Sequence, residues 1–195
     1  PICARGYAED SQAIGREAET SAGALRAIAI GTLSKSSGNY ATSLGSSAEA
    51  TAERAIAVGY KSKAEAERAI SVGNLANATK NDSIAVGNNS AASGLNASAV
   101  GKNSKASGQS AAAFGDTAQA TNTNATAVGN QANASNTNTT AIGNQTVASG
   151  GNATAVGHLS QATADGATAI GTNNKAGYEG TAVGLSNTVT GRTSA

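Results

Sequence analysis

A 14-residue repeat runs through almost the whole chain, and it constrains the fold more than any other feature. Each repeat carries a small residue, then an apolar residue, then glycine. The first interval between these glycines is 16 residues, the last is 13, and the ten between are all 14. The glycines are Gly15, Gly31, Gly45, Gly59, Gly73, Gly87, Gly101, Gly115, Gly129, Gly143, Gly157, Gly171 and Gly184.

The residues before each glycine are equally regular. The residue two places before is always Ala or Ser, as in Ala57 and Ser71. The residue immediately before is always apolar: Ile14, Ile30, Leu44, Val58, Val72, Val86, Val100, Phe114, Val128, Ile142, Val156, Ile170 and Val183. Such a register predicts a repetitive architecture in which each repeat contacts only its neighbours.

The pattern within each repeat predicts β structure. Fourteen residues are too few for a helical hairpin, and in the segment 27–30, Ala-Ile-Ala-Ile, large and small residues alternate with the period of a strand. Glycine follows and permits a corner. A second corner is predicted seven residues later, where Gly38, Gly94, Gly108, Gly150, Asn122 and Asn136 stand at one phase, because Gly and Asn tolerate left-handed backbone. We therefore predict an all-β, parallel solenoid of about 13 coils.

The predicted core is a thin slot. The residues that form it are predicted to be the apolar column from Ile30 to Ile170, together with columns of alanine, and the column of glycines from Gly31 to Gly171 is predicted to form the turns. Aromatic residues make up only 3% of the chain, which fits a slot too narrow for them. Phe114 is expected to widen the slot locally. The pattern leaves open which face of the alternating strand points inward.

The same strand predicts self-association. It is apolar or small on both faces, whereas a strand with one face in water usually alternates with polar residues. A long apolar stripe must then lie outside the core of the single chain, and such a stripe implies a partner surface. A closed cyclic oligomer would bury it symmetrically.

Composition and charge exclude several classes. The net charge of +1 offers no basis for binding nucleic acid. No run of 18 apolar residues and no signal peptide is present, and we expect the chain, which begins at Pro1, to start inside a longer precursor. Cys3 is the only cysteine and has no CxxC or metal-binding pattern around it, so we interpret it as an incidental terminal residue.

The coils resemble the head repeat of the YadA-like trimeric autotransporter adhesins. The segments 81–92, 124–132 and 166–171 carry this resemblance, which extends from about residue 8 to 189. The exceptions are a longer interval around Gly23 and a shorter one around Glu179, where we expect altered corners.

The resemblance implies a homotrimer of left-handed parallel β-rolls, with residues 1–195 forming a single head domain. No stalk, neck or membrane anchor can be identified in the chain. Family members stand outside the outer membrane of bacteria on a stalk and an anchor, bind collagen, fibronectin, laminin or host-cell receptors, and promote autoaggregation. The repeat identifies the scaffold and leaves the ligand open.

Candidate site residues are few. No catalytic, cofactor or metal site is predicted, because His158 has no positioned partner and the nearest acid in sequence, Asp165, lies half a coil away. Arg26, Arg54 and Arg68 share one phase, where Glu53 and Glu67 are expected to offset their repulsion. The stretch 117–164 has no Lys, Arg, Asp or Glu, and its polar surface is our candidate for ligand binding: Asn124, Asn130, Gln131, Asn138, Asn144, Gln145 and Asn152.

Three alternatives to an adhesin remain. One is a spacer with only a structural role. An ice-binding solenoid would use the ladder of Thr126, Thr140, Thr154 and Thr168, but this ladder shares a face with Ile28 and Ile56 and is expected to be buried. A β-helical enzyme is disfavoured by the lack of a catalytic cluster and by a period of 14.

Overall fold

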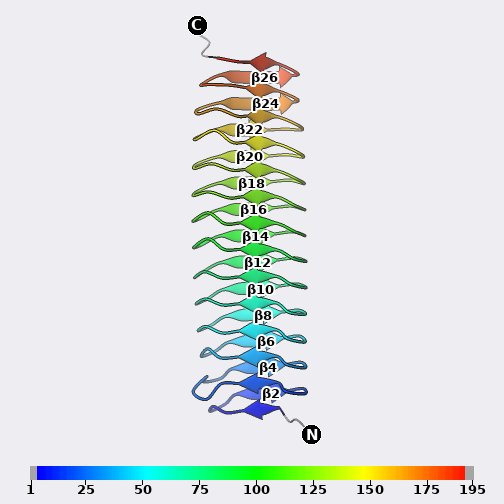
Figure 1. The fold of residues 1–195 in the computed structure, drawn as a ribbon, viewed down its shortest axis with the longest axis vertical. Helices are drawn as coiled ribbons and strands as arrows, with labels where there is room; N and C mark the ends of the chain where they lie inside the picture. The colour runs from blue at the N-terminus through cyan, green and yellow to red at the C-terminus, as the bar shows by residue number, and fades with distance from the viewer. Residues whose placement is uncertain (1–3, 192–195) are drawn as a thin grey trace. The chain divides into compact units, whose positions relative to one another are not determined.

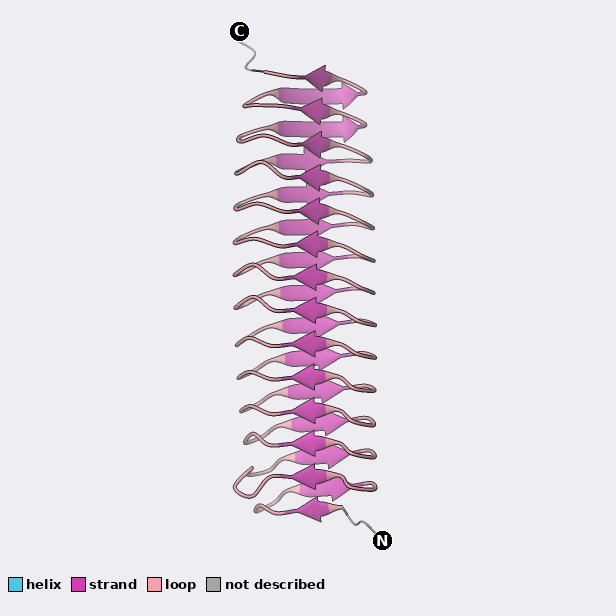
Figure 2. Ribbon diagram, viewed as in Figure 1, coloured by secondary structure: helices cyan, strands magenta, loops and turns pink. Residues whose placement is uncertain are grey.

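The structure is a computed structural model, and it describes residues 4–191. It confirms a parallel β-solenoid with a repeat of about 14 residues. Every coil contains one short strand and one longer strand joined by two corners (Figure 1, Figure 2). Backbone contacts divide the chain into two compact units, residues 1–102 and 103–195, and each unit has the same construction.

In the first unit, two parallel sheets face each other. The short-strand sheet contains β1 (Arg5–Gly6), β3 (Glu19–Thr20), β5 (Lys35–Ser36), β7 (Glu49–Ala50), β9 (Lys63–Ala64), β11 (Asn77–Ala78) and β13 (Ala91–Ala92). The long-strand sheet contains β2 (Gln12–Ile14), β4 (Ile28–Ile30), β6 (Thr42–Leu44), β8 (Ile56–Val58), β10 (Ile70–Val72), β12 (Ile84–Val86) and β14 (Ser98–Val100).

The second unit repeats these two sheets. Its short-strand sheet contains β15 (Lys105–Ala106), β17 (Gln119–Ala120), β19 (Asn133–Ala134), β21 (Val147–Ala148), β23 (Gln161–Ala162), β25 (Lys175–Ala176) and β27 (Thr188–Val189). Its long-strand sheet contains β16 (Ala112–Phe114), β18 (Thr126–Val128), β20 (Thr140–Ile142), β22 (Thr154–Val156), β24 (Thr168–Thr172) and β26 (Thr181–Leu185).

The register of the strands follows the sequence repeat. Ile70 pairs with Ile84, 14 residues later, and Val72 pairs with Val86. The longer first interval appears as Gln12 pairing with Ile28, and the shorter last interval as Thr168 pairing with Thr181. Residues at the same phase of the repeat therefore stack into columns. Successive residues of a column lie about 4.8 Å apart, which is the usual spacing of neighbouring strands.

Each coil turns at two corners of similar shape. The first corner follows a long strand and begins at the repeat glycine, and the second corner follows a short strand. The predicted turn glycines, from Gly31 to Gly171, all lie at the first corner with positive φ. At the second corner the prediction was wrong about which residue is left-handed. Gly38 has no positive φ, whereas Tyr40, two residues later, has φ of 58°.

The interior is built from small residues, which corrects the predicted core. Ala85 in β12 and Ala50 in β7 are fully buried, and so are Ala48 and Ala55, each of which comes just after a corner. Four columns of Ala, Ser and Thr therefore point inward, with Asn174 the largest fully buried side chain. Short corners hold the two sheets close together, so the space between them is filled by small side chains.

The predicted apolar core column instead points outward. Leu44 is 45% exposed and Phe114 is 41% exposed, so Phe114 does not widen the interior. Of the other residues assigned to the core, Val128, Ile142 and Ile170 are exposed, and Ile30, Val58, Val72, Val86, Val100 and Val156 are half-buried. The prediction placed the larger residues inside because apolar side chains usually avoid water, but here the interior has no room for them.

Two serines on one column of the core give a matched prediction about stability. Ser71 Oγ is buried with no hydrogen-bond partner within residues 4–191, whereas Ser43 Oγ lies 2.8 Å from Ser36 Oγ. An unpaired buried hydroxyl costs free energy that alanine avoids. We expect Ser71→Ala to raise the free energy of unfolding by about 1 kcal/mol and Ser43→Ala to lower it by about 1 kcal/mol. Urea denaturation measures both changes, and equal shifts in the two variants would contradict the assignment.

Candidate functional site

The most extensive candidate site is the outward surface of the long-strand sheet, here called the apolar face. In each long strand of three residues from β4 onward, the middle residue is buried and the outer two point away from the interior. In the first unit these outer residues are mostly Ile, Val and Leu, as in Ile56 and Val58. Ile56 is 37% exposed in the single chain. Exposed apolar surfaces of this kind are typical of contacts between proteins.

In the second unit the apolar face changes composition. From β18 on, the first outward residue of each long strand is threonine, whereas the residue before the repeat glycine remains apolar, as in Thr140 and Ile142. The threonine ladder, Thr126, Thr140, Thr154 and Thr168, is half-buried and points outward. The expectation that it lies buried was therefore wrong for the single chain, because its phase is also that of Ile28 and Ile56 on the outward side.

A column of charged and aromatic residues stands at the second corner of the first unit. Arg26 and Arg54 lie on either side of Tyr40, each with its guanidinium carbon 6.0 Å from the ring centroid. As predicted, acidic neighbours accompany the arginines: Arg54 lies 3.4 Å from Glu53, and Arg68 pairs with Glu67. The column thus balances its own charge, as a solvated edge does.

Sequence reasoning missed one member of this column. Arg68 Nε and Nη2 donate to the two carboxylate oxygens of Asp82 at 2.5 and 2.8 Å. This hydrogen bond from the guanidinium lowers the pKa of Asp82 below its ordinary value. A carboxyl group whose pKa is lowered by folding stabilises the folded state at pH values above the ordinary pKa of Asp. This stabilisation is lost as the pH falls through the lowered pKa. Since both side chains are exposed, the contribution is small.

The predicted ligand surface is divided between two edges of the second unit. Asn124, Asn138 and Asn152 stand at the second corner, where Asn124 Nδ2 donates to Asn138 Oδ1 at 3.0 Å and Asn138 Nδ2 to Asn152 Oδ1 at 3.1 Å. At the first corner, Asn144 Nδ2 donates to Asn130 Oδ1 at 3.0 Å and Gln145 Nε2 to Gln131 Oε1 at 2.9 Å. The seven residues therefore lie on two separate edges, with one amide ladder at the second corner and two neighbouring ladders at the first corner.

Backbone conformation explains part of this asparagine content. Asn124, Asn138 and Asn152 all have φ of 55° or 56°, in the left-handed region that Asn enters more readily than most residues. At the first corner the left-handed residues are Gln131 and Gln145, with φ of 56° and 54°. Glutamine has no such preference, so the corner conformation does not account for these two side chains.

Comparison with known proteins places these surfaces in a family context. The family model described as the YadA head domain repeat (2 copies) matches residues 22–48, 50–76, 64–90, 78–104, 92–118, 106–132, 120–146 and 148–174. The matched segments cover well over half of the chain. The chain belongs to the YadA head family. Among curated proteins, none matches it.

The YadA head repeat and the solenoid fold are structural rather than catalytic in type. His158 is exposed at a first corner, whereas Asp165 lies at a second corner, where its Oδ1 accepts from the backbone N–H of Gly151 at 2.7 Å. Within residues 4–191 no group of three or more His, Cys, Asp or Glu residues could hold a metal ion. Cys3 lies outside the described residues.

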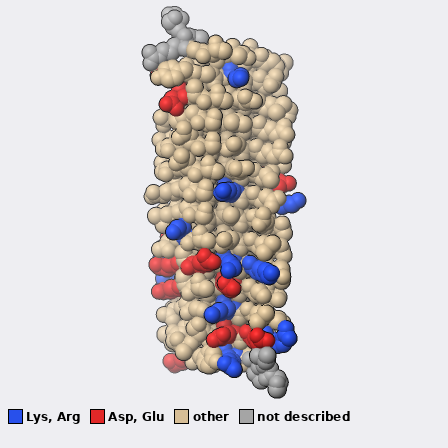
Figure 3. Space-filling view, viewed as in Figure 1, with Lys and Arg blue, Asp and Glu red and all other residues tan. Residues whose placement is uncertain are grey.

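The described part of this YadA head contains no helix with the length and hydropathy needed to cross a membrane. Its charged side chains are unevenly distributed. In the view of Figure 3, Lys, Arg, Asp and Glu gather over the first unit, and the second unit shows few of them. The two units therefore present different surface chemistry on the same backbone.

Proposed function

We propose that the chain is the head of a trimeric autotransporter adhesin, displayed on a bacterial surface, where it binds host matrix proteins or cell receptors. The observation that carries the proposal is the apolar face, because every long strand places large apolar or threonine side chains outside the interior of its own chain. The repeats that match the YadA head family support it.

The proposed assembly is a homotrimer of left-handed rolls, with residues 1–195 forming one head domain. Three copies arranged around an axis would turn their apolar faces toward one another, which buries the face in a closed symmetric assembly. Such an assembly leaves the short-strand sheets outside and available for ligands.

The proposed ligand surface is the first-corner edge of the second unit. In the first unit, the left-handed residues of first corners line hollows together with the outward residues of the short strands, as Leu33 does with Lys35 and Leu75 with Asn77. By the repeat, Gln131 and Gln145 occupy the same phase. Amide side chains both donate and accept hydrogen bonds, and three copies would multiply weak contacts with a fibrous partner such as collagen, fibronectin or laminin.

We predict that removing the first-corner amides weakens matrix binding. In a variant with Asn130→Ser, Gln131→Gly, Asn144→Ser and Gln145→Gly, glycine preserves the left-handed backbone while the ladder is lost. We expect binding to immobilised collagen, fibronectin or laminin to fall by about tenfold or more, because each lost contact is multiplied over three copies. Surface plasmon resonance against the three matrix proteins measures the change.

The matched control removes the amide ladder at the other edge, with Asn124→Gly, Asn138→Gly and Asn152→Gly, and is expected to retain binding. Equal loss of binding in both variants would show that the first-corner edge is not the specific ligand surface. If the unchanged chain binds none of the matrix proteins, the matrix-binding part of the proposal is rejected.

One observation favours a second candidate, an ice-binding solenoid. The outward threonine column stands beside an apolar column at a regular spacing, and in a monomer both would meet water. Trimer formation would cover this face. Thermal hysteresis together with a monomeric mass would support ice binding, and a trimeric mass without hysteresis would exclude it.

A further inference from the structure

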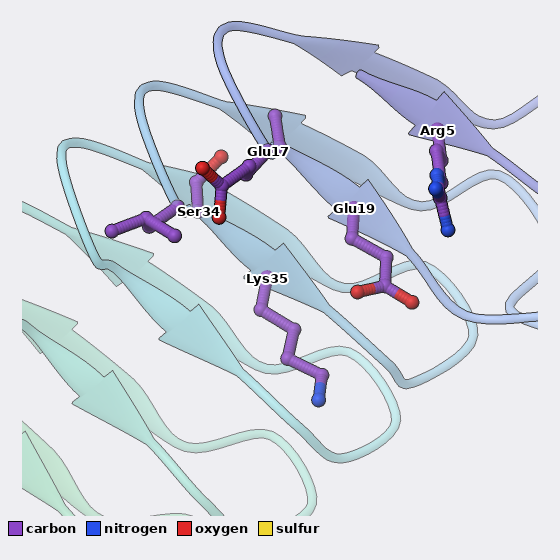
Figure 4. A pocket seen from close by; sticks show the side chains of 7 residues that line it. Arg5, Glu17, Glu19, Ser34 and Lys35 are labelled. Carbon is purple, nitrogen blue, oxygen red and sulfur yellow. The ribbon is translucent and has the colours of Figure 1, made fainter. Parts of the chain in front are cut away.

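A second regular surface lies on the short-strand sheet of the first unit. The outward residue that begins each of its first five strands is charged, and the sign alternates from coil to coil. Paired registers place these residues next to one another in a single column, here called the charge ladder: Arg5, Glu19, Lys35, Glu49 and Lys63. Figure 4 shows the first three side chains in a row on successive strands.

The charge ladder is exposed and only partly neutralised along its own column. Lys63 Nζ lies 3.3 Å from Glu49 and 4.0 Å from Glu65, with 44% of the lysine side chain exposed. The column continues with the neutral residues Asn77 and Ala91. In the first unit, this surface therefore has five residues of alternating charge at one end of the column and neutral residues at the other end.

A second column runs beside the ladder and carries two more charges. The left-handed residues of the first corners, here called the flanking column, include Glu17, Leu33, Ser47, Lys61 and Leu75. Between the two columns lie shallow hollows of about 320 Å³ at Glu17 and Leu33 and about 430 Å³ at Lys61 and Leu75. These hollows give the side chains of a partner space to enter.

The arrangement of signs is complementary to a second copy of the same chain turned end to end. When two copies face each other antiparallel, with the twofold axis between Lys35 and Glu49, Glu19 faces the other copy's Lys63. Lys35 then faces the other copy's Glu49. Both copies have the same spacing between coils, so all four contacts form at once.

The flanking column selects this register independently. A twofold axis that lies in the plane between the faces, perpendicular to the stacking direction, brings each column opposite its own counterpart. With the axis between Lys35 and Glu49, Glu17 faces the other copy's Lys61, again with opposite charge. With the axis one coil earlier, between Glu19 and Lys35, Glu17 would face Leu33.

A parallel, in-register arrangement gives the opposite result. Each ladder residue would then face its own counterpart, so that all five pairs would carry like charges. Like charges placed opposite each other repel, and this repulsion discriminates between arrangements more strongly than attraction alone.

We propose that the charge ladder and its flanking column form a docking surface for a second copy of this chain in antiparallel orientation. The inference rests on the proposed function, in which the short-strand sheet stays on the outside of the trimer. Heads that project from two facing surfaces meet antiparallel and associate. Heads that stand side by side at the same height on one surface are parallel and in register, and they repel. Each exposed ion pair is weak, so the association depends on several pairs at once and on low salt.

The test compares three versions of residues 1–195 by sedimentation velocity at about 20 mM and about 0.5 M NaCl, concentrations at which charges are weakly and strongly screened. The single-swap variant, Glu49→Lys with Lys63→Glu, keeps the net charge but makes the four ladder contacts of the antiparallel register like-charged. The double-swap variant adds Glu19→Lys and Lys35→Glu, which makes all four contacts opposite again.

At low salt, we expect the unchanged chain and the double-swap variant to form assemblies of higher mass than they form at high salt. The single-swap variant should associate about tenfold more weakly or not at all, as a like-charged interface does. Because the double-swap variant contains the single-swap substitutions, its association also shows that they permit folding.

Two outcomes would overturn the inference: no salt-sensitive association of the unchanged chain, or equal association of all three versions. A parallel arrangement staggered by one coil predicts the same weakening in both variants, so failure of the double swap to recover would overturn the antiparallel geometry. The proposed trimer is judged separately, by the mass at high salt, and matrix binding by the amide variants.

Discussion

Gly87→Ala is expected to lower the free energy of unfolding by about 2–6 kcal/mol, combining backbone strain with a steric clash. Gly87 has φ of 133°, which side-chain-bearing residues rarely adopt. A Cβ at this position would lie 2.5 Å from the carbonyl oxygen of Gly101 in the next coil. The oxygen belongs to the stacked backbone, so it can move only if neighbouring coils separate.

Thermal or urea unfolding followed by circular dichroism measures this loss. The control is Lys80→Ala at a second corner, where φ is not positive and the side chain is exposed. Its effect should stay within about 0.5 kcal/mol, as for most surface substitutions. A Gly87→Ala protein as stable as this control would show that the coils stack less closely than the structure describes.

The second large effect is expected on assembly. Replacing Ile84 and Val86 with aspartate should convert the proposed trimer into a folded monomer. Both side chains point outward from β12, so the substitutions leave the small-residue interior intact. In the trimer, however, each copy would bury two unpaired carboxylates in an apolar contact, which costs several kcal/mol per charge.

Sedimentation equilibrium measures the mass, and circular dichroism confirms that the monomer is folded. Ala91→Asp is the matched control, because Ala91 points outward from β13 on the opposite sheet. The control should remain trimeric. A trimeric Ile84→Asp, Val86→Asp protein would place the contact between copies elsewhere.

The strand register could be read from the sequence because the spacing alone determines it. Once Ile70 and Ile84 are known to share a phase, parallel stacking pairs them, as the structure shows. The two irregular intervals were also located correctly as altered corners. Spacing of this kind is a local property, and the fold adds only nearest-neighbour contacts to it.

The inward face could not be read from the same pattern. Alternation separates two sets of residues but does not say which set faces the interior, and the usual rule that larger apolar residues lie inside failed. A usable signal was present in the variability of each column. Ala57 and its equivalents are always Ala or Ser, whereas the column of Phe114 also accepts Val, Ile and Leu. A confined space permits less variation than an open one.

The candidate site was only partly predictable for a related reason. Asn124 and Asn130 are close in sequence but lie on opposite sides of a long strand, so they reach different edges. Arg68 and Asp82 are 14 residues apart and pair across one coil step, a relation that comparison of sequence neighbours misses. In a solenoid, phase within the repeat decides which residues meet.

The two irregular repeats have a consequence for how such a chain can change length. The two additional residues near Gly23 and the missing residue near Glu179 both lie between a short strand and the following long strand, at the second corner. In the described coils, by contrast, every short strand that follows a repeat glycine begins 4 residues after it, as Lys35 does after Gly31 and Thr188 after Gly184. Insertions and deletions of one or two residues are therefore absorbed on one side only. Whole coils can be gained or lost without changing the phase of any remaining residue. The number of coils can therefore vary in steps of 14 residues while the contacts within every remaining coil stay the same.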